Sequence, residues 1–156
     1  MRAIKSLLGK RLPPSRAVHL ELGERGEQAA IKYLKDYQGY EIVATNFRVP
    51  LGRGLRGQRL TAEIDIVAYD EAALVFVEVK TRTEDELFSP QHAVDLRKKR
   101  QIARAASRYR QMMGVTDEPY RYDVVTVIPE GEKPRIELLR AYFDDGVFSS
   151  GRFFWK

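Results

Sequence analysis

Two runs of apolar and β-branched residues, separated by a very short connection, constrain this chain more than any other feature. Residues 63–68 and 73–80 are both typical of strands, and the four residues between them leave room only for a tight turn. Both runs carry apolar residues on both of their faces, as strands do when a sheet is covered on each side. The sequence therefore predicts an antiparallel hairpin inside a covered sheet.

Three charged residues of this hairpin stand at positions that its register can bring together. With a two- or four-residue loop centred on residues 71 and 72, Asp65 lies directly across from Glu78, and Glu78 shares a strand face with Lys80. A three-residue loop would send Asp65 to the opposite face. Charged residues on an exposed sheet face are common, but these strands are predicted to be covered, and a buried charge needs a partner or a metal.

The chemistry of these residue types points to a hard divalent cation. Two adjacent carboxylates repel each other by up to about 1 kcal/mol, and Mg²⁺ or Mn²⁺ bound by both would offset this repulsion. We therefore predict a metal site held by Asp65 and Glu78, with the positive charge of Lys80 beside it. Such a set of groups suits phosphodiester hydrolysis, in which a metal ion activates water.

The remaining pattern supplies the elements around the hairpin. A helix is expected from Leu22 to about Gly39, with Glu27 among its apolar positions, followed by a strand over residues 41–47. The glycine- and arginine-rich residues 50–57 are expected to form a flexible basic loop. A second helix should begin at the N-cap Asp95 and end before Gly114, with the apolar stripe Ile102, Ala105, Ala106, Tyr109 and Met113.

Strands over residues 123–128 and 135–139 complete the pattern. The order helix, three strands, helix, strand predicts an α/β fold with a mixed central sheet flanked by helices.

Composition limits the class of protein. With 156 residues, one domain is expected. The net charge of +5 and the pI of about 9.5 favour a nucleic acid as partner, whereas the absence of cysteine excludes disulfides and thiolate metal sites. No apolar run is long enough for a signal peptide or a membrane span, so a cytoplasmic protein without membrane contact is expected.

Several basic and aromatic residues are candidates for nucleic-acid contact. The predicted set is Arg82, Arg97, Lys98, Lys99, Arg100 and Arg104, although a solvated helix face explains most of them equally well. Arg53, Arg56 and Arg59 invite the same interpretation. Residues 153–155 could stack on bases, but docking on the domain or on a second subunit is favoured. His19 and His92 lack metal-ligand spacing and are left unassigned.

Six segments, in order, carry a resemblance to a known family: GERGEQAA at 23–30, NFR at 46–48, EIDIVA at 63–68, LVFVEVKTR at 74–82, AVD at 93–95 and YDVV at 122–125. Together they resemble the YraN-type UPF0102 family of the restriction-endonuclease-like (PD-(D/E)XK) superfamily, which is similar to archaeal Holliday junction resolvases. The resemblance implies an αβββαβ core, Asp65 and Glu78 as metal ligands, Lys80 as the catalytic lysine and Glu27 as a helical glutamate that supports the metal site.

The chain departs from the family pattern in two places. Residues 49–62 form a longer connection, with Ala62 in place of a glycine, and Phe88-Ser89 stands where a Phe-Gly pair is common. The expected division is a basic N-terminal extension (1–20), a nuclease-like domain (21–145) and an aromatic C-terminal tail (146–156).

The resemblance implies a Mg²⁺-dependent endonuclease that hydrolyses DNA, with branched, Holliday junction-like structures as candidate substrates. A binding module that keeps the fold without cutting is the alternative, and a structural or ribosome-associated basic protein is a third class. Resolvase-like relatives often act as dimers, so a homodimer is compatible with the resemblance.

Overall fold

The structure, a computed structural model, describes residues 14–82 and 94–149. Expectations for residues 1–13, for Phe88, Ser89, His92 and Ala93, and for the aromatic residues 153–155 lie outside this part. The described elements are α1 (Pro14–Tyr37), β1 (Glu41–Arg53), β2 (Arg59–Asp70), β3 (Ala73–Thr81), α3 (Leu96–Met113), β4 (Tyr120–Ile128), β5 (Arg135–Phe143) and a short 3₁₀ helix, η1 (Asp145–Phe148).

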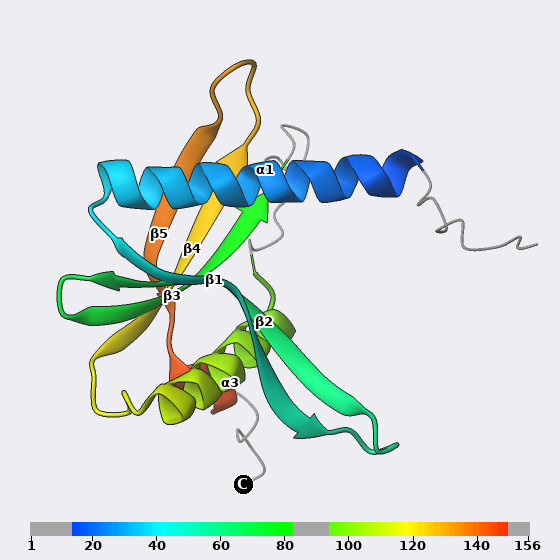
Figure 1. The fold of residues 1–156 in the computed structure, drawn as a ribbon, viewed down its shortest axis with the longest axis vertical. Helices are drawn as coiled ribbons and strands as arrows, with labels where there is room; N and C mark the ends of the chain where they lie inside the picture. The colour runs from blue at the N-terminus through cyan, green and yellow to red at the C-terminus, as the bar shows by residue number, and fades with distance from the viewer. Residues whose placement is uncertain (1–13, 83–93, 150–156) are drawn as a thin grey trace, which may run out of the picture.

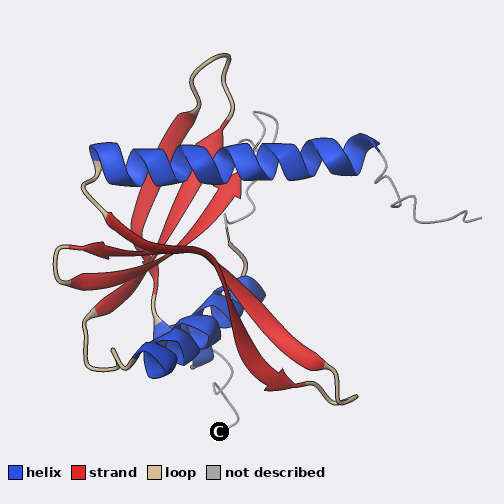
Figure 2. Ribbon diagram, in the orientation of Figure 1, coloured by secondary structure: helices blue, strands red, loops and turns tan. Residues whose placement is uncertain are grey.

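The sheet has the order β1-β2-β3-β4-β5, in which β3 and β4 are parallel and the other neighbours are antiparallel (Figure 1). The chain passes from β3 to β4 through α3, because parallel neighbours need a long crossover. In Figure 2, α1 lies across one face of the sheet and α3 lies against the other. The predicted fold class, a restriction-endonuclease-like α/β core with a mixed sheet flanked by helices, is confirmed.

Alternation along β3 divides the interior into two layers. Phe76 belongs to the layer under α3, where its ring packs edge-on against Tyr109 at a centroid distance of 5.6 Å. Val75 and Val77 face the other way and pack with Leu34 of α1. Each fully buried side chain of this size contributes about 1.5–3 kcal/mol to stability, so both faces of the central strand are held by apolar contacts.

The hairpin between β2 and β3 has a two-residue loop, one of the two loop lengths that bring Asp65 opposite Glu78. Asp70 pairs with Ala73 across Glu71 and Ala72, and the ladder continues in register to Ile66 and Val77. Glu71 has a φ of 54°, which a tight hairpin turn requires. This register places Asp65 in line with Glu78.

The basic segment 50–57, predicted as a flexible loop, is paired strand as far as Arg53 and a short turn beyond it. Pairing between β1 and β2 extends to Arg53 and Arg59, and the turn is closed by a hydrogen bond from the Gly54 amide to the Gln58 carbonyl at 2.8 Å. The glycines that suggested a loop lie at a bulge and in the turn of the paired strands β1 and β2. Gly52, with a φ of 103°, lies beside a bulge, and Gly57, with a φ of 76°, lies in the turn.

The helices also differ in detail from the prediction. α1 begins at Pro14 and not near Leu22, so part of the predicted N-terminal extension is helical; proline is favoured in the first turn of a helix, where its missing N–H costs nothing. The predicted ends of α3 are confirmed, with Asp95 accepting from the Lys98 amide and Gly114 in the left-handed conformation. The prediction that Met113 belongs to the apolar stripe is wrong, because Met113 is 46% exposed; Ala103, which was not predicted, is buried in the stripe.

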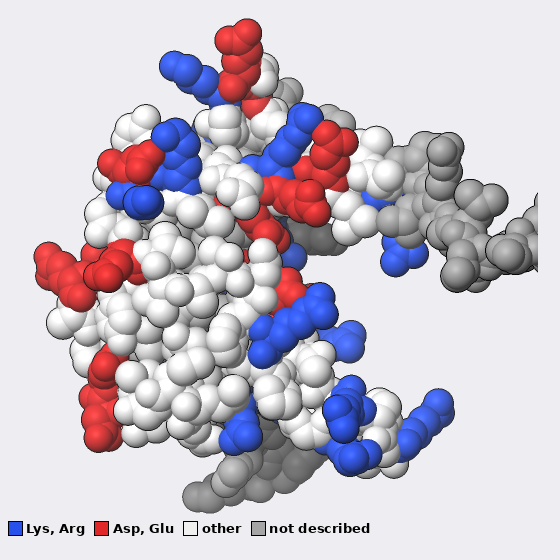
Figure 3. All heavy atoms as spheres, viewed as in Figure 1, with Lys and Arg blue, Asp and Glu red and all other residues white. Residues whose placement is uncertain are grey.

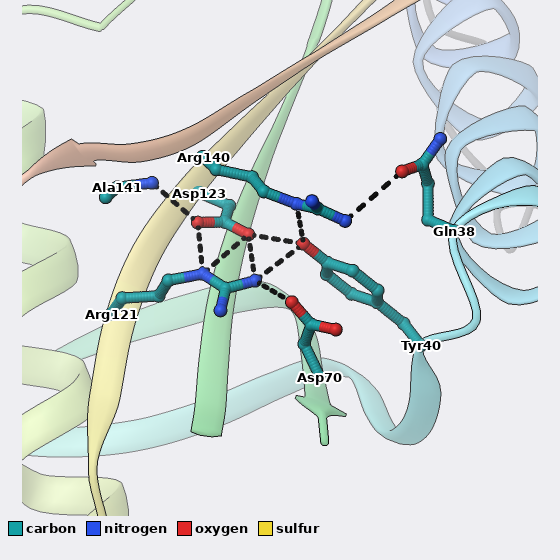
Figure 4. Close-up of polar contacts among 7 residues, drawn as sticks. All are labelled: Gln38, Tyr40, Asp70, Arg121, Asp123, Arg140 and Ala141. Carbon is teal, nitrogen blue, oxygen red and sulfur yellow. Dashed lines mark hydrogen bonds and ion pairs between the residues drawn. The ribbon is translucent and has the colours of Figure 1, made fainter. Parts of the chain in front are cut away.

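A polar network ties the strands together on the α1 face (Figure 4). Asp123 is fully buried and accepts hydrogen bonds from Tyr40 at 2.8 Å and from Arg121 at 3.0 Å, while Arg121 also binds Asp70 at 2.6 Å. The amide of Ala141, which has a φ of 48° beside a bulge in β5, donates to Asp123 as well. The network therefore provides an acceptor for a backbone amide that has no strand partner at this bulge.

Neither helix of the described part of the chain is both long enough and apolar enough to cross a membrane.

Candidate active site

The candidate site lies at a fork where β2 separates from β3. The β2–β3 ladder ends at Ile66 and Val77, and Asp65 is the next residue of β2 beyond that pair. The amide of Val79 donates a hydrogen bond of 2.8 Å to the Asp65 carboxylate. The Asp65 carboxylate thus takes the place of a backbone carbonyl as acceptor for the Val79 amide, which would otherwise lack a partner. This hydrogen bond holds the carboxylate toward β3.

Glu78 lies beside Asp65 and is buried. Its exposed fraction is only 5%, and burial together with the charge of Asp65 raises the pKa of Glu78 to about 7. Burial also raises the pKa of Asp65, against the opposing effects of the Val79 amide and Lys98. The two carboxyl groups therefore resist being ionised together, as adjacent buried acids do.

Two ammonium groups contact the same carboxylate. Lys98 Nζ is 3.3 Å from Glu78 Oε1, and Lys80 Nζ is 3.9 Å from the same oxygen. Lys98 comes from the first turn of α3, which Asp95 caps. Sequence reasoning assigned Lys98 to nucleic-acid contact, but the structure places it at the carboxylates. No local pattern in the sequence marks Lys98 for this place, because its position depends on how α3 docks on the sheet.

Glu27 approaches the site from α1 because a glycine lets the helix come close to β3. A Cβ on Gly26 would lie 2.0 Å from Thr81 Oγ1, a separation that no side chain tolerates. Glu27 is half-buried, interacts with the side chain of Asn46, and lies near enough to Asp65 for their charges to interact. Burial is the main cause of its raised pKa.

Asn46 is a residue whose place in the site sequence reasoning missed. It lies between the pairs Thr45–Ile66 and Phe47–Ile64, and so is level with Asp65 on the neighbouring strand. Its φ of 50° is left-handed, a conformation in which asparagine is enriched. The only signal was its place in the NFR segment of the family resemblance. The structure therefore gathers side chains from α1, β1, β2, β3 and α3.

The other predicted nucleic-acid residues are not a uniform solvated face. Lys99 Nζ lies 4.9 Å from the centroid of the Tyr142 ring, and Arg100 Nε donates to the Val147 carbonyl at 2.8 Å. Arg104 is exposed and lies over the Phe148 ring, Arg97 is exposed, and the Arg82 amide extends the pairing of β3 by donating to the Val127 carbonyl. Lys99, Arg100 and Arg104 therefore help hold β5 and η1 against α3.

The surface near the fork is open. Figure 3 shows a wide notch between the N-terminal half of α1 and the projecting end of β1 and β2. A hollow of about 570 Å³ on this side is lined by Glu21, Glu24, Arg25, Glu27, Gln28 and Asn46. A groove of about 670 Å³ between α3 and the end of β1 is lined by none of Asp65, Glu78 and Lys80 and is therefore separate from the carboxylates.

The donor set fits Mg²⁺ or Mn²⁺. Within residues 14–82 and 94–149, no three acidic or histidine side chains form a cluster that could enclose an ion. Magnesium needs no such cage, since one or two carboxylates usually hold it while water and substrate phosphate fill the other positions. Burial and the charge of Asp65 raise the pKa of Glu78, so a cation between the two carboxylates would relieve this repulsion.

The mixed sheet, with an aspartate where β2 separates from β3 and Glu-x-Lys on β3, defines a restriction-endonuclease-like protein. The chain belongs to the family described as "Uncharacterised protein family UPF0102", which matches residues 26–127. It is 37% identical over 138 residues to a UPF0102 protein of Koribacter versatilis, covering 88% of this chain and 90% of the relative. It is 43% identical over 123 residues to one of Porphyromonas gingivalis, covering 78% and 82% of the two chains.

Proposed function

We propose that the protein is a Mg²⁺-dependent endonuclease that hydrolyses phosphodiester bonds in DNA. The observation that carries this proposal is the pairing of Asp65 with the buried Glu78 at the fork, beside the ammonium groups of Lys80 and Lys98. Buried carboxylates with raised pKa values beside specific charge partners are candidates for function, because no purely structural need is met by their repulsion.

In this proposal Asp65 and Glu78 hold Mg²⁺ or Mn²⁺. When bound, the metal lowers the pKa of a coordinated water and balances negative charge on the phosphate. Lys80, which is 39% exposed, places a positive charge where it can reach the substrate phosphate or the attacking water. Glu27 and Asn46 support the approach of α1 to the site through their side-chain interaction.

The raised pKa of Glu78 predicts how metal binding depends on pH. A carboxylate must be ionised to bind Mg²⁺, so protons compete with the metal below the Glu78 pKa of about 7. Metal affinity and cleavage should therefore fall as the pH drops below neutrality.

The test is incubation with linear, flapped and four-way branched DNA in the presence of Mg²⁺ or Mn²⁺. We expect cleavage that is lost in Asp65→Asn and Lys80→Ala. Asparagine can still accept the hydrogen bond of Val79, so its loss of activity would report the missing charge and not a broken strand contact. Glu137→Gln removes an exposed carboxylate from β5 and serves as the control. Cleavage that survives either site substitution would refute the assignment.

A non-catalytic nucleic-acid-binding module is the second candidate, and one contact favours it. Lys98 Nζ lies closer to Glu78 than Lys80 Nζ does, at 3.3 Å against 3.9 Å, so an internal cation already offsets part of the charge of the carboxylate. This alternative expects DNA binding that is equal with Mg²⁺ and with a chelator, and that Asp65→Asn leaves unchanged. The endonuclease proposal expects Mg²⁺ to strengthen binding at the site and Asp65→Asn to remove that gain.

A further inference from the structure

The strands β1 and β2 continue beyond the fork as a two-stranded ribbon that leaves the body of the molecule (Figure 1). We call this ribbon the β1–β2 arm; it comprises residues 47–53, the turn 54–58 and residues 59–64. Pairing along it runs from Phe47 and Ile64 to Arg53 and Arg59. Because Asp65 immediately follows Ile64, the last residue of the arm, the arm starts at the candidate site.

The base of the arm has a fixed direction. Val49 is fully buried and Ala62 is 4% exposed, both within the apolar layer that α3 covers. The Phe47 ring packs edge-on against Tyr109 of α3 at a centroid distance of 5.0 Å. An isolated two-stranded ribbon is only marginally stable in water, so this packing is what holds the arm out from the sheet.

The end of the arm is cationic and carries an exposed apolar residue. Arg53, Arg56 and Arg59 are exposed, and Leu55 at the turn is fully exposed. Residues 49–62 contain no aspartate or glutamate. Figure 3 shows the blue side chains gathered at this end with no red ones among them. Such a surface is complementary to a polyanion.

The edges of the arm are poorly suited to pairing with another strand. Pro50 lacks an N–H, a bulge lies between Pro50 and Gly52, and arginines flank the turn. These are the devices by which proteins prevent edge-to-edge association. A nucleic acid is therefore a better partner for the arm than the sheet of a second copy.

We propose that the β1–β2 arm lies in a groove of duplex DNA bound at the candidate site, with its arginines on the phosphates; this inference rests on the proposed function. The major groove of B-DNA admits a two-stranded ribbon. Seven residues of strand span about 20 Å, which corresponds to about six base pairs. The arm therefore reads the duplex on one side of the cleaved phosphate, and Leu55 provides apolar contact to base edges.

The first experiment measures DNA affinity against salt concentration for the full chain, with Ca²⁺ in place of Mg²⁺. The variant is Arg56→Gln with Arg59→Gln; Arg53 is kept, because its side chain donates to the Gly57 carbonyl and holds the turn. We expect affinity to fall at least tenfold and the salt dependence to lose about two phosphate contacts.

The matched control is Lys35→Gln with Lys133→Gln, two exposed lysines at the end of α1 and in the turn before β5, with the same change in net charge. This variant should bind DNA within about twofold of the wild type. Equal losses in both variants would show that only net charge matters, which would overturn the proposal for the arm.

The second experiment shortens the duplex on either side of the cleavage position. Wild-type cleavage should fall at least tenfold once one flank is shorter than about six base pairs, and Leu55→Ser should weaken binding only to duplexes that keep that flank. Cleavage without any flank dependence, and with unchanged salt dependence in the arginine variant, would overturn the arm while leaving the endonuclease intact. Salt-dependent binding through the arm without any cleavage would instead refute the proposed function.

An arm that pairs with a second copy gives a different result. In that case the arginine variant binds DNA like the wild type. In gel filtration, however, its elution volume depends on protein concentration differently from that of the wild type. This outcome would overturn the DNA assignment.

Discussion

Replacing Glu78 with glutamine should stabilise the metal-free protein at alkaline pH. The wild-type carboxyl is buried next to Asp65, and its pKa rises from 4.5 to about 7 on folding. Glutamine has nearly the same shape but cannot ionise, so it removes the cost of charging this group in the folded state. The attraction of Lys98 and Lys80 to the carboxylate is already contained in the net rise of the pKa.

The magnitude follows from proton linkage. A rise of this size corresponds to about 3 kcal/mol between the fully protonated and the fully ionised protein. Because the folded state holds its proton to a higher pH than the unfolded state, wild-type stability falls as the pH rises from about 4.5 to 7. The advantage of Glu78→Gln is therefore absent below pH 4.5 and complete above about pH 8.

The assay is thermal unfolding between pH 4.5 and pH 9 in a chelator, with Glu137→Gln as the exposed control. At pH 8.5, Glu78→Gln should unfold about 6–12 °C above the wild type, and at pH 4.5 the two should coincide. Excess Mg²⁺ should then raise the wild-type midpoint and leave that of the variant unchanged. A variant no more stable than the wild type at pH 8.5 would refute the account of burial and repulsion at the fork.

Three further changes test the surroundings of the site. Gly26→Ala should cost about 1–3 kcal/mol by forcing α1 away from Thr81 Oγ1, and Thr81→Ala should recover part of this loss in a denaturant titration. Asp123→Asn should lower the unfolding free energy by about 3 kcal/mol, measured the same way, because the guanidinium bound to it loses a buried counter-ion. Asn46→Gly should keep the fold but reduce metal-dependent cleavage, whereas Asn46→Ala should also lose about 1 kcal/mol of stability at its positive φ.

The sequence was most informative where a pattern has one physical solution. The runs 63–68 and 73–80 bring Asp65 opposite Glu78 in one register, which a two- or four-residue loop gives and a three-residue loop does not. The pairing of Asp70 with Ala73 is that register. The caps of α3 were equally readable, because an N-cap aspartate and a left-handed glycine act through local geometry.

The remaining features depend on contacts that no local pattern encodes. The glycines of the arm look like a loop, yet α3 supplies the packing that keeps Val49 and Ala62 in paired strands. The charge of Lys98 gives no indication that it lies 3.3 Å from Glu78 Oε1, because that position depends on how α3 docks on the sheet. Tertiary packing decided both cases.

One event in the fold accounts for both the candidate site and the arm. If β2 continued along β3 beyond Ile66, the amide of Val79 would have a backbone partner and the Asp65 side chain would be free to turn elsewhere. Because β2 instead leaves with β1, the amide needs another acceptor, and the Asp65 carboxylate supplies it. The same departure brings Asp65 beside Glu78 and sends the cationic ribbon outward from that point. A change that straightened the fork would therefore disturb the carboxylate pair and the direction of the arm together.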